Sequence, residues 1–157
     1  MKKKCKIGDK VPEFKIPLSN GNFLETKNLK GKKYILYFYP KDNTPGCTNQ
    51  AKDFSVRISE LEKLNTQVIG ISKDSIETHN KFINKHALKI LLGSDEEGKV
   101  LEKFGVWVEK NMYGRKYMGI ERTTFLISET TKIEFIWEKV RVKGHVEEVI
   151  NRIKSAN

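Results

Sequence analysis

The chain has only two cysteines, Cys5 and Cys47, in 157 residues. This scarcity excludes a small scaffold held by disulfides, and in a reducing compartment such cysteines are catalytic, redox-active or simply buried. No apolar run approaches the roughly 18 residues that a membrane span needs. The segment after the basic run Lys2–Lys4 also lacks the hydrophobic stretch of a signal peptide. We therefore expect a cytoplasmic protein without membrane contact.

Clusters of metal ligands are missing as well. The three histidines, His79, His86 and His145, are dispersed along the sequence. His79 and His86 share one face of a predicted helix, but no carboxylate or cysteine accompanies them at zinc-binding spacing. We expect these histidines at the surface and no metal site.

Acidic residues are fewer than basic ones, 20 against 30, which gives a formal net charge of +10. Such a charge suits nucleic acid or another anionic surface. However, no zinc-finger spacing, Gly-rich RNA-binding signature or basic helix accompanies it, and the aromatic residues are dispersed. A solvated basic surface is the preferred interpretation, and binding to nucleic acid stays as the alternative.

The length is typical of one domain with its own core, so residues 1–157 are expected to form a single domain. Alternating strands and helices in the first two thirds indicate a parallel sheet. The residues from Val106 to Met118 show no clear period and predict a loop or excursion that covers part of a site. Apolar spacing, turn residues and helix caps predict these elements: a hairpin from Phe14–Leu18 and Phe23–Glu25, strands at Tyr34–Tyr39, Gln67–Ile71 and Lys89–Leu92, a helix from Cys47 through Leu64, a helix from Asp74 to His86, a short helix before Gly105, a second hairpin from Thr123–Ser128 and Lys132–Trp137, and a closing helix after His145.

The most informative segment runs from Pro40 to Cys47. It follows the apolar strand Tyr34–Tyr39, and Phe54 and Ile58 then repeat at helical spacing. Cys47 is therefore expected at or inside the first turn of a helix, where the amides have no helical partner. A free thiol has a pKa of about 8.5 and is mostly protonated at neutral pH. The helix N-terminus favours the thiolate, so the segment predicts a reactive cysteine.

Further residues nearby and at a distance suit a reactive thiol. Pro45-Gly46 makes a tight turn that lets backbone amides approach the sulfur, and Thr44 supplies a hydroxyl. Arg122, directly before the strand at Thr123–Ser128, is the preferred cationic partner, because a parallel sheet gathers distant strand ends at one edge.

Pro40, Thr44 and Cys47, with Arg122 later, resemble the active-site pattern of peroxiredoxins, and the likeness is closest to the bacterioferritin comigratory protein or Q-type subgroup. It extends over essentially the whole chain. The segments that carry it are Gly8–Pro12, Phe38–Asp42, Thr44–Thr48, Val68–Ser72, Asp95 with Gly98, and Gly144-His145.

The resemblance implies a thioredoxin-like α/β fold, with a central mixed β-sheet flanked by helices and an N-terminal β-hairpin. It implies a thiol peroxidase that serves in antioxidant defence by reducing hydrogen peroxide and organic hydroperoxides, and it calls for no cofactor. Cys47 would become a sulfenic acid. Thr44 would orient the peroxide, while Arg122 and the amides of Gly46 and Cys47 would stabilise negative charge. Pro40 would shield the pocket from water. By analogy with the subgroup, the protein would be a monomer.

The chain departs from the subgroup at the resolving cysteine, because Lys52 stands five residues after Cys47, where many members have a second cysteine. No cysteine follows Cys47. Three interpretations of Cys5 stay open: a free thiol, an intramolecular resolving cysteine and an intermolecular one. The favoured cycle uses one cysteine and an external thiol, namely thioredoxin, glutaredoxin or glutathione. A disulfide reductase is disfavoured because Thr44 occupies the first position of Cys-x-x-Cys, whereas a peroxide sensor remains an alternative.

Overall fold

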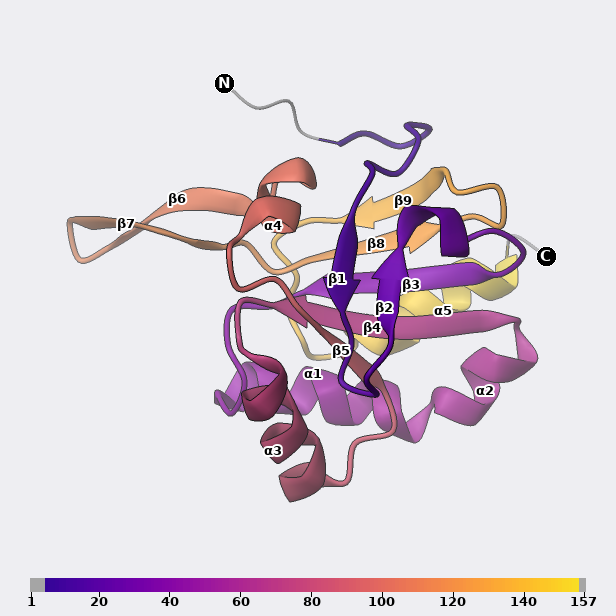
Figure 1. Cartoon of the computed structure of the whole chain (residues 1–157), viewed down its shortest axis with the longest axis horizontal. Helices are drawn as coiled ribbons and strands as arrows, with labels where there is room; N and C mark the ends of the chain where they lie inside the picture. Colours follow the sequence, from indigo (N-terminus) through magenta and orange to yellow (C-terminus); the bar gives the residue numbers. More distant parts are fainter. Residues whose placement is uncertain (1–4, 156–157) are drawn as a thin grey trace.

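The computed structural model describes residues 5–155, so the basic run Lys2–Lys4 lies outside the described residues. At its centre is a five-stranded mixed sheet in the order β5-β4-β3-β8-β9 (Figure 1). The neighbours β3, β4 and β5 are parallel, whereas β8 runs antiparallel to β3 and β9 antiparallel to β8. The strands are β3 (Lys33–Phe38), β4 (Thr66–Ser72), β5 (Leu91–Ser94), β8 (Thr123–Ile127) and β9 (Ile133–Trp137).

Both faces of the sheet are covered, which explains why β3 is an unbroken buried run. One face packs against helices, and the other packs against α4 (Lys99–Lys103) and a hairpin of β1 (Lys15–Pro17) and β2 (Phe23–Glu25). Along β3, Leu36 points to the hairpin side and Ile35 to the helical side. The helices on the helical side are α1 (Pro45–Val56), α2 (Ile58–Lys63), α3 (Ile76–His86) and α5 (His145–Ser155).

Most elements predicted from the sequence are confirmed. The β1–β2 and β8–β9 pairs are antiparallel hairpins. Helix α3 begins after Ser75, whose side chain accepts a hydrogen bond from the amide of Thr78, and it ends at Ala87 in the left-handed region. Within residues 5–155, no helix has the length and apolar character needed to cross a membrane.

The helix predicted from Cys47 through Leu64 is interrupted. Arg57 ends α1 and precedes α2 with φ −106° and ψ 11°, which is outside the helical region. Its guanidinium pairs with Glu60 and with Glu147 of α5. The apolar spacing continues across Arg57, so it did not indicate that the helix breaks at this polar residue, which contacts another helix.

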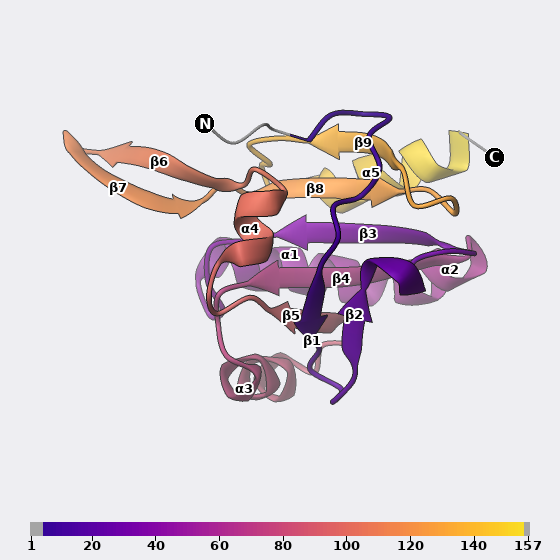
Figure 2. The same cartoon turned by 45° about the horizontal axis from the view of Figure 1, so that its top comes forward.

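The loop predicted over Val106–Met118 is wrong, because this segment enters a second small sheet. Strands β6 (Trp107–Met112) and β7 (Arg115–Ile120) form an antiparallel hairpin that projects from the body of the molecule (Figure 2). Tyr113 and Gly114 both have positive φ, 53° and 79°, as a tight hairpin turn requires. The outer part of the hairpin is exposed on both faces, so its sequence lacks the alternation of a half-buried strand.

The surface positions expected for the histidines are also wrong for two of them. His79 is 0% exposed and His145 is 4% exposed. Both rings have polar partners. Nδ1 and Nε2 of His79 contact Asp42 and the carbonyl of Gly93, and Nε2 of His145 contacts the hydroxyl of Thr124. A buried histidine is tolerated when its nitrogens are hydrogen-bonded, and sequence spacing does not show those partners.

Gly70 of β4 gives a test of the packing between the sheet and α1. A Cβ atom at this position would lie 2.6 Å from Cζ of the buried Tyr37 ring. Gly70→Ala should therefore lower the free energy of unfolding by about 2 kcal/mol, measured by urea denaturation. Gly119→Ala is the control, since its Cβ would meet the flexible end of Lys110 at 3.3 Å. Equal stability of the two variants would contradict the packing of Tyr37 over Gly70.

Candidate functional site

The thiol of Cys47 is buried at the N-terminus of α1. Thr44 is the N-cap residue, Pro45 is the first helical residue, and Cys47 follows as the third. The first helical hydrogen bond runs from the amide of Thr48 to the carbonyl of Thr44, at 2.9 Å. Cys47 is 1% exposed. The helix places unpaired amides and the positive end of its dipole beside a sulfur that is largely shielded from water.

Arg122 contacts this sulfur. Its Nη2 lies 3.2 Å from Cys47 Sγ. The sheet register explains the approach, because Phe38 at the end of β3 pairs with Thr123 at the start of β8. Arg122 was expected at this edge, but the strand that brings it there is antiparallel rather than parallel.

Two residues of α1 make the contact with Arg122 possible. A Cβ atom on Gly46 would lie 3.3 Å from Nη2, so glycine leaves room for the guanidinium. Gln50 is fully buried, and its Oε1 accepts a hydrogen bond of 2.6 Å from Nη1 of Arg122. The sequence interpretation missed Gln50, although it stands three residues after Cys47 and so shares its helix face.

The remaining residues of the segment before Cys47 have less direct roles in this geometry. The hydroxyl of the half-buried Thr44 donates to the carbonyl of Lys41 at 3.0 Å, and its oxygen can still accept a hydrogen bond. Pro40 is exposed, at the point where β3 has ended. Lys52, at the position of the missing resolving cysteine, is an exposed helix residue.

Cys5 lies on the other face of the sheet from Cys47. It packs against the cluster of the N-terminal hairpin and α4, whereas Cys47 belongs to the helical cluster. Both thiols are free, and the half-buried Cys5 lies 3.5 Å from the carbonyl of Lys103. Burial raises the pKa of Cys5, and Asp9 raises it further. A disulfide between the two cysteines would need the chain to rearrange, because a Cα separation beyond about 7 Å cannot be bridged.

The β6–β7 hairpin adds a second cation to the site. Lys110 is half-buried although neighbouring residues of the hairpin are exposed, and its side chain lies along Gly119. Burial lowers the pKa of Lys110, and the charge of Arg122 lowers it further. Glu121 and Cys47 act in the opposite direction. The charges of Arg122 and Cys47 thus influence the pKa of Lys110, while the expectation that this segment covers part of a site stays a prediction.

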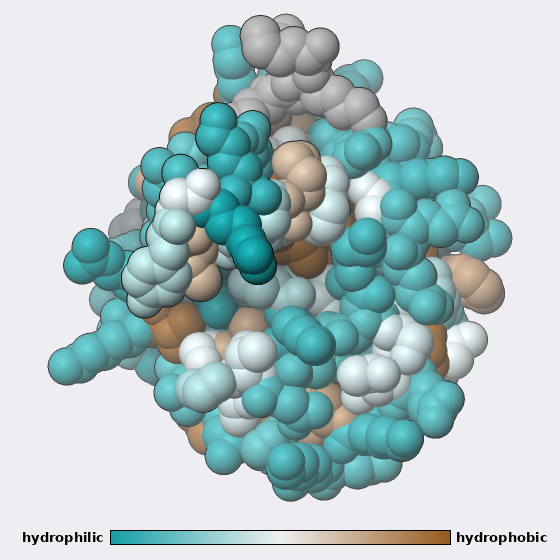
Figure 3. Space-filling model, turned by 90° about the vertical axis from the view of Figure 1, so that its left-hand side faces the viewer, coloured by the Kyte–Doolittle hydropathy of each residue, from teal (hydrophilic) through white to brown (hydrophobic). Residues whose placement is uncertain are grey.

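Single apolar patches interrupt an otherwise hydrophilic surface on the side from which the hairpin projects (Figure 3). At the tip of the hairpin, Met112 is 56% exposed and Tyr113 is 101% exposed.

The geometry describes a nucleophilic thiol that can react only with a small electrophile. A buried sulfur faces a fixed positive charge and unpaired amides, which stabilise negative charge on the sulfur and on atoms bonded to it. On a thioredoxin-like sheet, this is the class of thiol-dependent peroxidases.

Comparisons with known proteins agree with this class. Residues 7–136 match the model of the AhpC/TSA family, and the chain belongs to that family. It is 51% identical to a Coxiella burnetii protein named as a peroxiredoxin Bcp over 147 residues, which cover 94% of this chain and 97% of that protein. It is 45% identical to peroxiredoxin Bcp of Bacillus subtilis over 148 residues, covering 94% of each.

Solved structures give the same result. A Xylella fastidiosa PrxQ C47S mutant superposes with a TM-score of 0.92 at 35% identity and 98% coverage of each chain. Xanthomonas campestris bacterioferritin comigratory protein superposes with a TM-score of 0.90 at 34% identity, covering 96% of this chain and 99% of that one. The fold is therefore the thioredoxin-like fold of peroxiredoxins, and the protein is a thiol peroxidase.

The buried His145 predicts a pH dependence of stability. Burial, helped by the charge of Arg122, lowers the pKa of His145 to about 4, against 6.5 in the unfolded chain. Between pH 4 and pH 6.5 the unfolded chain binds more protons at His145 than the folded chain does. The free energy of unfolding is therefore at its full value above pH 6.5 and decreases as the pH falls toward 4. His145→Gln should remove about 2 kcal/mol of this loss, measured by urea denaturation at pH 7 and pH 4.5. The control His86→Gln should keep most of the wild-type dependence, because the pKa of His86 is lowered less than that of His145. An unchanged dependence in His145→Gln would contradict the assignment.

Lys110 predicts a charge preference at Cys47. Lys110→Met should lower alkylation by the anion iodoacetate more than alkylation by neutral iodoacetamide, changing the ratio of the two rates about threefold. Lys116→Met is the control, because Lys116 is 73% exposed and pairs with Glu109 on the opposite face of the hairpin. Added salt should shrink the effect. If both variants give the wild-type ratio, the charge of Lys110 does not act at the thiol.

Proposed function

We propose that Cys47 is the peroxidatic nucleophile of a one-cysteine peroxidase. The observation that carries this proposal is the distance of 3.2 Å between the buried Sγ and Nη2 of Arg122 at a helix N-terminus. The thiolate attacks the terminal oxygen of a peroxide ROOH and the O–O bond breaks. Sulfur loses two electrons and becomes the sulfenic acid Cys47–SOH, while RO⁻ leaves and is protonated to water or an alcohol.

The neighbouring residues support the transition state. Arg122 and the amides of Gly46 and Cys47 stabilise the charge that moves from sulfur onto the oxygens. Thr44 orients the peroxide through its hydroxyl, and Pro40 limits the access of water. Gln50 holds the guanidinium of Arg122 in place through its hydrogen bond of 2.6 Å.

Reduction of the sulfenic acid falls to an external thiol in this proposal. Lys52 occupies the usual position of a resolving cysteine, and Cys5 packs on the opposite face of the sheet. Thioredoxin, glutaredoxin or glutathione would supply the two electrons, forming a mixed disulfide first. Because Cys47 is 1% exposed, a reductant reaches the sulfur only after the first turn of α1 opens. Resolution by Cys5 is the alternative cycle.

The substrates proposed are hydrogen peroxide and small organic hydroperoxides, which fit a nearly closed site. The Xanthomonas campestris relative has been described in terms of alkyl peroxide reduction, which supports this class. We place the activity in the cytoplasm, in a monomer whose residues 1–157 form one domain.

The test is the intact mass of the reduced protein after one equivalent of hydrogen peroxide without added thiol. We expect a gain of about 16 or 32 mass units in the wild type and in Cys5→Ser, but none in Cys47→Ser, since each oxygen added to sulfur gives one such step. The physical reason is that Cys47 has a cationic partner, Arg122, at its sulfur.

Other products would change the conclusion. A loss of about two mass units, or a covalent dimer, that needs both cysteines would make Cys5 the resolving residue. An unreacted Cys47 that iodoacetamide still labels would contradict the assignment of Cys47 as peroxidatic residue.

A further inference from the structure

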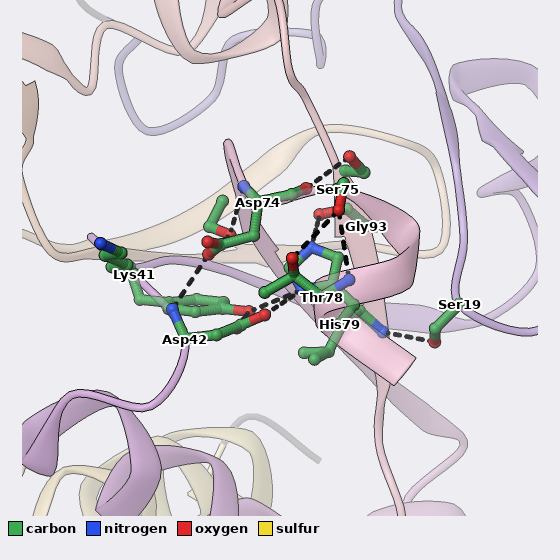
Figure 4. Close-up of polar contacts among 12 residues, drawn as sticks. Ser19, Lys41, Asp42, Asp74, Ser75, Thr78, His79 and Gly93 are labelled. Carbon is green, nitrogen blue, oxygen red and sulfur yellow. Dashed lines mark hydrogen bonds and ion pairs between the residues drawn. The ribbon is translucent and has the colours of Figure 1, made fainter. Parts of the chain in front are cut away.

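A buried polar network anchors the segment that leads to Cys47. Asp42 lies between Pro40 and Thr44 and is 4% exposed. Its carboxylate contacts His79 of α3, and its amide contacts Asp74, which follows β4 (Figure 4). Nothing in the peroxidase chemistry uses these contacts.

Asp42 is held at three points. Its Oδ1 accepts a hydrogen bond of 2.6 Å from the hydroxyl of Tyr39, and its Oδ2 lies 2.7 Å from Nδ1 of His79. Its backbone amide donates to Oδ2 of Asp74 at 2.9 Å. A residue in a loop between a strand and a helix rarely has its backbone and both carboxylate oxygens fixed at once, and such a residue cannot move without breaking several buried contacts.

His79 is the central member of the network. Its Nε2 lies 2.9 Å from the carbonyl oxygen of Gly93, which can only accept, so Nε2 carries a hydrogen. Its Nδ1 faces the carboxylate of Asp42, so the pair shares a proton between Nδ1 and Oδ2. The side chains of His79 and Asp42 are 0% and 1% exposed. Loss of one partner would leave the other buried without its hydrogen bond, which is costly.

Asp74 is equally fixed, so it gives the network a rigid base. The hydroxyl of Ser72 donates to its Oδ2 at 2.7 Å, and the hydroxyl of Ser94 donates to its carbonyl at 2.5 Å. The network thus joins the carboxyl ends of the three parallel strands to helix α3.

The fixed position of Asp42 determines where α1 begins. Asn43 follows in the left-handed region with φ 66°, and Thr44 is then the N-cap residue. The hydroxyl of Thr44 returns to Lys41, directly before Asp42. Since one residue separates Asp42 from Thr44, a shift of Asp42 moves the hydroxyl of Thr44 and the first turn that carries Cys47.

A metal site is the other interpretation of this group, because ligand atoms of Asp42, Asp74 and His79 lie within 4.8 Å of one another. The hydrogen bonds disfavour it. The Oδ2 atom of Asp74 already accepts from the amide of Asp42 and the hydroxyl of Ser72. The Nδ1 and Oδ2 atoms of the other two residues face each other at 2.7 Å, which leaves no space for an ion between them.

We propose that His79 is a positioning residue of the peroxidase: acting through Asp42, it holds the loop before α1 so that Thr44 and Cys47 meet the peroxide in reactive geometry. This proposal rests on the assignment of Cys47 as the peroxidatic residue.

The experiment compares His79→Gln, Asp42→Asn and the double variant with His86→Gln, the same change at the other histidine of α3. Two second-order rates are measured on folded protein at one pH: oxidation of Cys47 by hydrogen peroxide, and its alkylation by iodoacetamide, which does not need Thr44. We expect oxidation to fall about tenfold or more in His79→Gln, since small misplacements of reacting groups cost up to about a hundredfold. Alkylation should fall far less, and His86→Gln should match the wild type.

The double variant tests whether the two residues act as one unit. Its loss of oxidation rate should be close to that of the worse single variant, because residues in one contact are not additive. Tyr39→Phe removes only one hydrogen bond to Asp42 and replaces the other variants in the test if they do not fold. It should lower the oxidation rate by a smaller factor than His79→Gln. Amide hydrogen exchange gives a readout without activity: the amides of Asp42 and Thr48 should exchange faster in His79→Gln.

Four results would overturn the proposal. A lower melting temperature of His79→Gln with a wild-type oxidation rate would make His79 structural only. Equal losses of oxidation and alkylation would place its effect on the thiolate rather than on peroxide geometry. Additive losses in the double variant would separate His79 from Asp42. Loss of wild-type stability on dialysis against EDTA, restored by Zn²⁺, would indicate a metal site. If the wild type itself does not react with peroxide, the proposed function fails, and hydrogen exchange alone still tests the loop.

Discussion

The contact between Arg122 and the buried sulfur of Cys47 is the interaction on which the site depends. A thiolate that is 1% exposed is costly unless positive charge and hydrogen bonds replace water. Nη2 of Arg122, 3.2 Å from Sγ, supplies both the positive charge and a hydrogen bond. The contact exists because β8 runs antiparallel to β3 and starts where β3 ends, and because position 46 has no side chain to displace the guanidinium. Sheet topology and one glycine therefore set the electrostatics of the nucleophile.

Buried polar groups gather at this edge of the sheet for a physical reason. The parallel strands β3, β4 and β5 end together, and their following residues must satisfy backbone and side-chain groups away from water. Asp42, Asp74 and His79 hydrogen-bond one another at the loop before α1, while Arg122 contacts Cys47 and Gln50 within the first turns of α1. These contacts hold the loop and the start of the helix in a defined position before a peroxide arrives. Such preorganisation lowers the cost of reaching the transition state.

Much of the fold could be predicted from residue patterns because local rules and burial act together. The run from Tyr34 to Tyr39 is apolar because both faces of β3 are covered, and Ser75 caps α3 through a hydrogen bond to a nearby amide. The β6–β7 hairpin escaped prediction because its exposed strands have no apolar alternation. The break at Arg57 escaped because the apolar spacing continues across it, and Arg57 pairs with Glu147, 90 residues away, which sequence spacing does not show.

The sequence by itself predicted a reactive thiol at Cys47 and its immediate setting, since Gly46 and Cys47 lie where a strand end meets a helix start, while the roles expected of Pro40 and Thr44 come from the family pattern. Only the tertiary structure decided which distant groups meet them. Arg122 could be proposed but not placed, whereas Gln50, Lys110 and the buried pair of His79 and Asp42 were not anticipated. Such contacts depend on sheet register and on the direction of side chains across elements, and these are fixed by packing of the whole chain rather than by local preference.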